Sequence, residues 1–164
     1  GFENESARLC FYTGQAKSPC GFQLKKEMGP IYLLASRTVF VDRDWLFEAE
    51  VNLGLQKDLS YFYILAHEYA HHATGRIDLL QLVLNPPRFF TDRDRQALSV
   101  MNELTADALA GFILSKILGL TLIQEYGIEF LEDCAFRVGD DKIKSSSFTH
   151  GLGSERRTWI RKGL

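Results

Sequence analysis

The first third of the chain alternates short apolar runs with turn residues. Three runs of strand length are rich in aromatic and β-branched side chains, namely residues 9–12, 31–34 and 38–41. Glycine, proline and serine separate these runs, and residues 13–19 are predicted to form a turn. The pattern therefore predicts a small N-terminal sheet, and residues 38–41 are our first candidate for its free edge.

After Asp42 the apolar positions change to helical spacing. The sequence predicts helices over residues 44–53, 56–74, 79–84, 91–118, 121–135 and 155–161, a turn at 139–141 and a loop at 145–147. Thr91 and Ser154 are expected N-caps, and Gly75 is an expected C-cap. A small sheet followed by helices is an α+β arrangement, and the length favours a single domain over residues 1–164.

The predicted helix 56–74 contains the pattern H-E-x-x-H. A helix turns by about 100° per residue, so His67 and His71 project from one face and can bind the same metal ion. Glu68 follows the first histidine and lies close enough to act as a base without being a ligand. The sequence therefore predicts a hydrolytic zinc site with His67 and His71 as ligands and Glu68 as the catalytic base.

A catalytic zinc ion usually has three protein ligands, so a third must come from elsewhere. The extension H-E-x-x-H-x-x-G-x-x-H does not fit, because Gly75 is one position late and the next histidine is His150. Glu103 and Asp107 are four residues apart on the predicted helix 91–118. Such a pair alone is usually a solvated acidic face, but Asp107 lies in an apolar segment where an unpaired carboxylate is costly to bury. We predict Glu103 as the third ligand and Asp107 as the acceptor that orients a ligand imidazole.

Two further histidines have different predicted roles. His72 points about 100° away from His71 around the helix and is not counted as a ligand. His150 precedes the last predicted helix and is a candidate donor that stabilises an oxyanion during catalysis.

Composition and charge exclude some classes of partner. The chain is 46% hydrophobic and 24% charged, with a formal net charge of −2, which gives no electrostatic footprint for nucleic acid. The most apolar stretch, residues 104–123, is interrupted by Asp107 and Lys116, so no membrane span is predicted. The chain begins at Gly1 without methionine, and we expect it to be part of a longer or processed protein.

The three cysteines do not have the spacing of a zinc site. Cys10 and Cys20 flank the predicted turn, and the sequence is equally consistent with a disulfide between them and with two free buried thiols. Cys134 is predicted to be a small core residue in a helix.

The chain resembles the bacterial putative neutral zinc metallopeptidases from about residue 9 to the C-terminus. The motifs that carry the resemblance are Cys20-Gly21, Gly29-Pro30-Ile31-Tyr32, Thr38 to Asp42, Ala66 to His72, Glu103 to Asp107, Gly139-Asp140-Asp141 and Phe148 to Gly151 with Arg156 and Trp159. The resemblance implies a compact zincin-like fold, with a small sheet packed on a helical body, and zinc held by two histidines and a glutamate. It also implies a location outside the cytoplasm, which would be periplasmic, secreted or membrane-tethered.

These observations predict a zinc-dependent metalloendopeptidase that hydrolyses peptide or protein substrates. An extended substrate could bind by adding a strand to the free edge of the sheet. One alternative is a non-catalytic, zinc-containing module that binds a partner, although such a module has no need of Glu68. Another is hydrolysis of a non-peptide amide, which would use the same residues.

Overall fold

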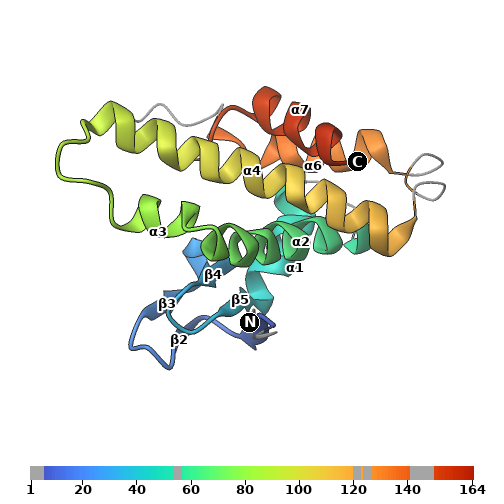
Figure 1. The fold of residues 1–164 in the computed structure, drawn as a ribbon. Helices are drawn as coiled ribbons and strands as arrows, with labels where there is room; N and C mark the ends of the chain where they lie inside the picture. The colour runs from blue at the N-terminus through green and yellow to red at the C-terminus, as the bar shows by residue number, and fades with distance from the viewer. Residues whose placement is uncertain (1–5, 54–56, 120–122, 124–126, 141–149) are drawn as a thin grey trace. The chain divides into compact units, whose positions relative to one another are not determined.

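The computed structural model describes residues 6–53, 57–119, 123, 127–140 and 150–164. The chain forms two compact units, Gly1–Lys57 and Asp58–Leu164. The first contains the strands, a short 3₁₀ helix and an α-helix, and the second is helical, which confirms the predicted α+β class (Figure 1). The single domain and the packing of the sheet on the helical body stay predictions.

The three predicted strands are present in the first unit. They are β1 (Arg8–Tyr12), β4 (Ile31–Leu33) and β5 (Thr38–Asp42), and their order in the sheet is β1-β5-β4. Strand β5 pairs in parallel with β1 and antiparallel with β4, and all five of its residues are buried. The expectation that residues 38–41 form a free edge is therefore wrong. A strand enclosed in this way has a continuous apolar run instead of alternation, and this run was visible in the sequence.

A second, two-stranded sheet was not predicted. Strands β2 (Gln15–Lys17) and β3 (Gln23–Lys25) form an antiparallel hairpin, followed by the short 3₁₀ helix η1 (Lys26–Met28). The predicted turn over residues 13–19 is thus partly strand. These strands are mostly polar, and only Leu24 is buried, in a cluster with Tyr12 and Phe40. Three residues are too few for an alternating pattern to be recognised.

Helix α1 (Arg43–Leu53) begins directly after β5. The buried carboxylate of Asp42 accepts a hydrogen bond from the backbone of Trp45 at 2.9 Å and another from the backbone of Gly14 at 2.6 Å. Asp42 therefore caps the helix and also fixes the turn after β1, since it satisfies a backbone donor at each place.

The cysteines are free thiols. Cys10 and Cys20 are exposed, so neither the disulfide nor the pair of buried thiols that the sequence allowed is present. Cys134 is buried in α6 (Ile128–Arg137), as predicted, and burial raises the pKa of its thiol to about 11.

The second unit is built around a long helix, α4. Its helices are α2 (Lys57–Arg76), α3 (Leu79–Leu84), α4 (Asp92–Leu118), α6 and α7 (Gly153–Gly163). Helix α7 lies along α4 and also packs against α6 (Figure 1). The predicted N-cap of α4 is confirmed, because the Thr91 hydroxyl accepts from the Asp94 backbone and the Asp94 carboxylate accepts from the Thr91 backbone.

Several predicted helix ends are wrong. Helix α2 continues through Gly75 to Arg76, so Gly75 is not its cap. Ser154 lies inside α7, whose first turn is closed by the Glu155 carboxylate accepting from the backbone of Leu152 at 3.1 Å. Of the predicted helix 121–135, the structure shows α6 from Ile128, while residues 120–122 and 124–126 lie outside the described part of the chain. A turn after α6 is present at residues 138–139, and the predicted loop 145–147 is outside the described residues.

By length and composition alone, α4 could cross a membrane, a test that the core helix of a globular domain also passes. Its side chains at Asn102 and Asp107 are buried and contact histidines of α2. We therefore interpret α4 as a core helix of the second unit.

Helices α4 and α7 approach each other closely at two glycines. A Cβ atom added at Gly111 of α4 would lie 2.4 Å from the backbone oxygen of Ile160, and one at Gly163 of α7 would lie 1.8 Å from the oxygen of Ala108. Real Cβ atoms essentially never come this close to backbone atoms, so any side chain at these positions would push the helices apart.

We expect Gly111→Ala to destabilise the protein by about 1–3 kcal/mol, the usual cost of overpacking a core. The substitution would otherwise stabilise a helix by roughly 1 kcal/mol, so the sign of the change tests the close approach. Urea unfolding measures it, with Ser99→Ala on the same helix as control. A more stable Gly111→Ala protein would contradict this packing.

Candidate metal centre

The structure brings together the three predicted ligands, two from α2 and one from α4. His67 and His71 are one turn apart on α2, and Glu103 reaches them from α4. The Nε2 atoms of the two histidines are 3.2 Å apart. Glu103 places Oε2 at 3.2 Å from His67 Nε2 and Oε1 at 3.3 Å from His71 Nε2. Within the described part of the chain, these residues form the group whose ligand atoms could hold one metal ion.

The spacing of these atoms fits zinc. Ligands arranged tetrahedrally at about 2.0 Å from a zinc ion lie ~3.3 Å from one another. The two Nε2 atoms are 3.2 Å apart, and each lies at a similar distance from one oxygen of the Glu103 carboxylate, 3.2 Å to Oε2 and 3.3 Å to Oε1, so the distances are close to this value. Two imidazoles and one carboxylate are also a donor set typical of hydrolytic zinc sites, which keep a fourth position open.

Asp107 contacts the first predicted ligand, His67. Its side chain is fully buried, and Oδ1 lies 2.9 Å from His67 Nδ1, on the side of the ring opposite Nε2. The Tyr63 hydroxyl, one helical turn before His67, donates to the same oxygen at 2.7 Å. A hydrogen on Nδ1 that is held by Asp107 leaves Nε2 of His67 free to bind a metal.

The buried charges shift one another's pKa values. Burial alone would lower the pKa of His67, but the Asp107 and Glu103 carboxylates raise it to about 10. Burial would raise the pKa of Glu103, yet hydrogen bonds with His67 and His71 hold it well below its ordinary value. For Asp107, burial is outweighed by Arg156 and His67, which lower its pKa. The carboxylates therefore favour the ionised form that ligation and orientation of a cation require, and binding of a metal at His67 would release the proton from Nε2.

Asn102 contacts the second ligand. Its Nδ2 lies 3.2 Å from His71 Nδ1, and among the described residues its buried Oδ1 has no hydrogen-bond partner. Metal binding through Nε2 requires a hydrogen on Nδ1 of His71, and this hydrogen needs an acceptor. Turning the Asn102 amide by 180° places Oδ1 on that hydrogen, so Asn102 can fix the metal-binding tautomer of His71.

Glu68 and His72 lie on the same helix outside the triad. Glu68 is half-buried and directly follows His67. Helical geometry places it about 60° around the axis from His71, beside the ligand-bearing face. His72 is buried with its ring centroid 5.7 Å from that of Tyr69, and the candidate metal group of the described residues does not include it.

His150 lies just before α7 and is held by Asp140. Its backbone donates to Asp140 Oδ2 at 2.7 Å, and its Nδ1 lies 3.3 Å from Oδ1, while the imidazole is 54% exposed. The next residue, Gly151, has a φ of +81°, and a Cβ there would lie 3.1 Å from the Val100 side chain and 3.7 Å from that of Leu104. The segment that carries His150 therefore runs against α4 within one turn of Glu103.

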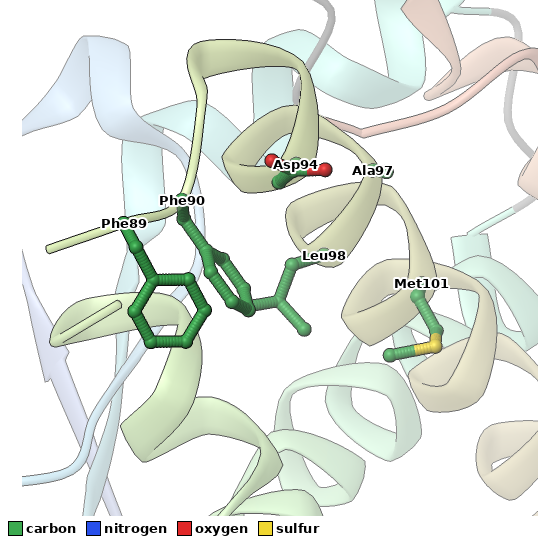
Figure 2. Close-up of a pocket in the computed structure, with 6 residues that line it drawn as sticks. All are labelled: Phe89, Phe90, Asp94, Ala97, Leu98 and Met101. Atoms are coloured by element: carbon green, nitrogen blue, oxygen red, sulfur yellow. The ribbon is translucent and has the colours of Figure 1, made fainter. Parts of the chain in front are cut away.

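Two shallow hollows of about 410 and 440 Å³ lie on α4 outside the triad. Figure 2 shows the first, where Phe89 and Phe90 lie beside Leu98, with Asp94 on the helical turn before Leu98 and Met101 on the turn after it. The second is lined by residues of α4 and by Glu155 and Trp159 of α7. Neither lining contains His67, His71 or Glu103, so the candidate metal ligands lie outside both hollows.

Comparison with known proteins agrees with this geometry. A family model described as "Putative neutral zinc metallopeptidase" matches residues 2–164. The chain belongs to this family. The resemblance stated from the sequence is thereby confirmed, and the family's description supports zinc as the metal of the triad.

The chain also matches two curated relatives. Both are named Uncharacterized protein YpfJ, one from Escherichia coli K12 and one from Escherichia coli O6:H1, and each is 28% identical over 168 residues. The match covers 98% of this chain and 58% of each relative, so the chain spans little more than half of their length. No solved structure matches the chain.

Sequence reasoning missed two residues of the centre and left a third without a role. Tyr63 precedes His67 by one helical turn, and Asn102 directly precedes Glu103. Their positions next to the two motifs were the sequence signal that could have identified them. Arg156 entered only through the resemblance. It lies 49 residues from Asp107, and no spacing rule could have joined them.

Proposed function

We propose that this protein is a zinc-dependent peptidase that hydrolyses internal peptide bonds of peptide or protein substrates. The observation that carries the proposal is the convergence of His67 Nε2, His71 Nε2 and the Glu103 carboxylate, with Glu68 next to His67 on the same helix. A structural zinc site is normally closed by four protein ligands, whereas three ligands with an adjacent carboxylate are typical of hydrolysis.

The residues of the metal centre have different parts in the proposed reaction. His67, His71 and Glu103 would hold the zinc ion, which when bound supplies a Lewis acid that activates water and polarises a carbonyl. Glu68 takes the proton from the attacking water and returns it to the leaving amine. Asp107 and Asn102 keep both imidazoles in the tautomer and orientation that ligation needs.

His150 is proposed as the donor that stabilises the developing oxyanion. Two observations support this role: Asp140 fixes the backbone of His150 and contacts its ring, and the adjacent Gly151 lies against Val100 and Leu104 on either side of Glu103. The exposed imidazole can then reach a substrate that enters from solvent.

The proposal is tested by incubating the protein, loaded with one equivalent of zinc, with an unfolded protein and with a library of short peptides. We expect cleavage at internal bonds that stops on addition of a chelator and returns when zinc is restored. Cleavage of small non-peptide amides alone would favour an amidase instead. Zinc binding without any hydrolysis, together with stable binding of a partner, would favour the non-catalytic module.

A further inference from the structure

We propose that Arg156 is a positioning residue of the metal centre, through which the C-terminal helix α7 fixes Asp107 and thereby the imidazole of His67. The inference rests on the proposed function, because it concerns the site that we assign to zinc. It adds a requirement that the motifs do not contain, namely that α7 completes the centre.

The guanidinium of Arg156 holds both oxygens of Asp107. Its Nε donates to Oδ2 at 2.8 Å and its Nη2 donates to Oδ1 at 3.0 Å, and both side chains are buried. Two parallel, charge-assisted hydrogen bonds define the plane of the carboxylate as well as its position. Oδ1 is also the atom that faces His67 Nδ1, so the two hydrogen bonds from Arg156 set the orientation in which Asp107 holds the His67 ring.

The same guanidinium reaches a second part of the centre. Its Nη1 donates to the backbone oxygen of Val138 at 3.2 Å. Val138 begins the turn that leads to Asp140, and the Asp140 carboxylate holds His150. One planar group therefore connects the orienting carboxylate on α4 with the turn that carries the proposed oxyanion donor. A lysine ammonium, which is a single point charge, could not make this set of contacts.

Helix α7 has other anchors that do not involve Arg156. Its backbone is in close contact with α4 at Gly111 and Gly163. On the side towards α6, Arg161 pairs with Glu132, and the Arg157 guanidinium lies 4.9 Å from the ring centre of Phe136. Replacing Arg156 should therefore leave α7 in place and change the metal centre selectively.

The test measures zinc affinity of the full chain by competition with a chelator of known affinity. We expect Arg156→Met to bind zinc ~10- to 100-fold more weakly, the usual effect of losing an orienting contact behind a ligand. Arg156→Lys keeps the positive charge but cannot make the two parallel hydrogen bonds to Asp107, so its zinc affinity should lie between those of Arg156→Met and the wild type. Arg157→Met, on the next residue of the same helix, is the matched control and should bind zinc like the wild type.

A double-mutant cycle separates positioning from a general structural role. If Arg156 acts through Asp107, the double variant Arg156→Met/Asp107→Ala should bind zinc about as weakly as Asp107→Ala alone. Additive losses, or wild-type affinity in Arg156→Met, would overturn the proposal. If Arg156→Met does not fold, a folded Arg156→Lys with wild-type affinity would overturn it equally.

The outcomes also distinguish this inference from the proposed function. Zinc binding that depends on Arg156, in a protein that cleaves nothing, would remove the peptidase proposal and leave the positioning role intact. If replacing Arg156 changed neither cleavage nor zinc binding, the positioning role would be overturned and the peptidase proposal would stand. A wild-type chain that binds no zinc would overturn both.

Discussion

His71→Ala is expected to lose its zinc during purification, whereas the wild-type chain retains one ion. The substitution removes one of the three residues whose ligand atoms lie within 4.8 Å of one another, so the ion would be left with two protein ligands. The loss of affinity should exceed the ~10- to 100-fold that follows from removing an orienting residue. His67→Ala should behave in the same way, and elemental analysis after gel filtration measures both.

His72→Ala is the matched control for this experiment. His72 is the neighbour of His71 on the same helix and is similarly buried, but it lies beside Tyr69 outside the triad. It should keep a full equivalent of zinc even if the variant is less stable. Full zinc in a folded His71→Ala protein would refute the ligand set.

The sequence predicted the strands and helices whose patterns are long or continuous, and it failed where local pattern is weak. The run that became β5 and the capped helix α4 are examples of success, since apolar content and the Thr91 cap gave clear signals. The β2–β3 hairpin was missed because its three-residue strands bury a single large side chain, Leu24. The position of β5 in the sheet was also missed, because pairing depends on which strands meet in space and no local pattern encodes it.

The candidate site shows the same division. His67, Glu68 and His71 follow from one spacing within a helix, and Glu103 with Asp107 follows from a second spacing. From the sequence, contact between these two helices was a hypothesis based on the number of ligands that zinc needs. The 3.2 Å contact between His67 and Glu103 shows that the helices do meet. Arg156 could not be assigned a role in this way, because its contact with Asp107 depends on how α7 packs against α4.

Glu68→Gln is expected to keep its zinc and its fold while hydrolysis falls by ~10²-fold or more, the range typical of losing a general base. Glutamine has nearly the same size and retains a hydrogen-bonding oxygen, but it cannot take a proton from water at neutral pH. Because Glu68 is not one of the three ligands, zinc content should equal that of the wild type. The measurement compares kcat, KM and bound zinc for a peptide whose cleavage the chelator abolishes.

Two further variants help to interpret a loss of hydrolysis in Glu68→Gln. Glu129→Gln removes an exposed carboxylate on α6 and should leave both cleavage and zinc unchanged. His150→Ala should also keep its zinc but lower kcat by ~10²-fold, as loss of an oxyanion donor does. If Glu68→Gln cleaved the peptide at the wild-type rate, the assigned mechanism would be wrong. If wild type and variant both cleaved nothing yet bound the same partner equally, the protein would be a zinc-containing binding module, and Glu68 would have no chemical role.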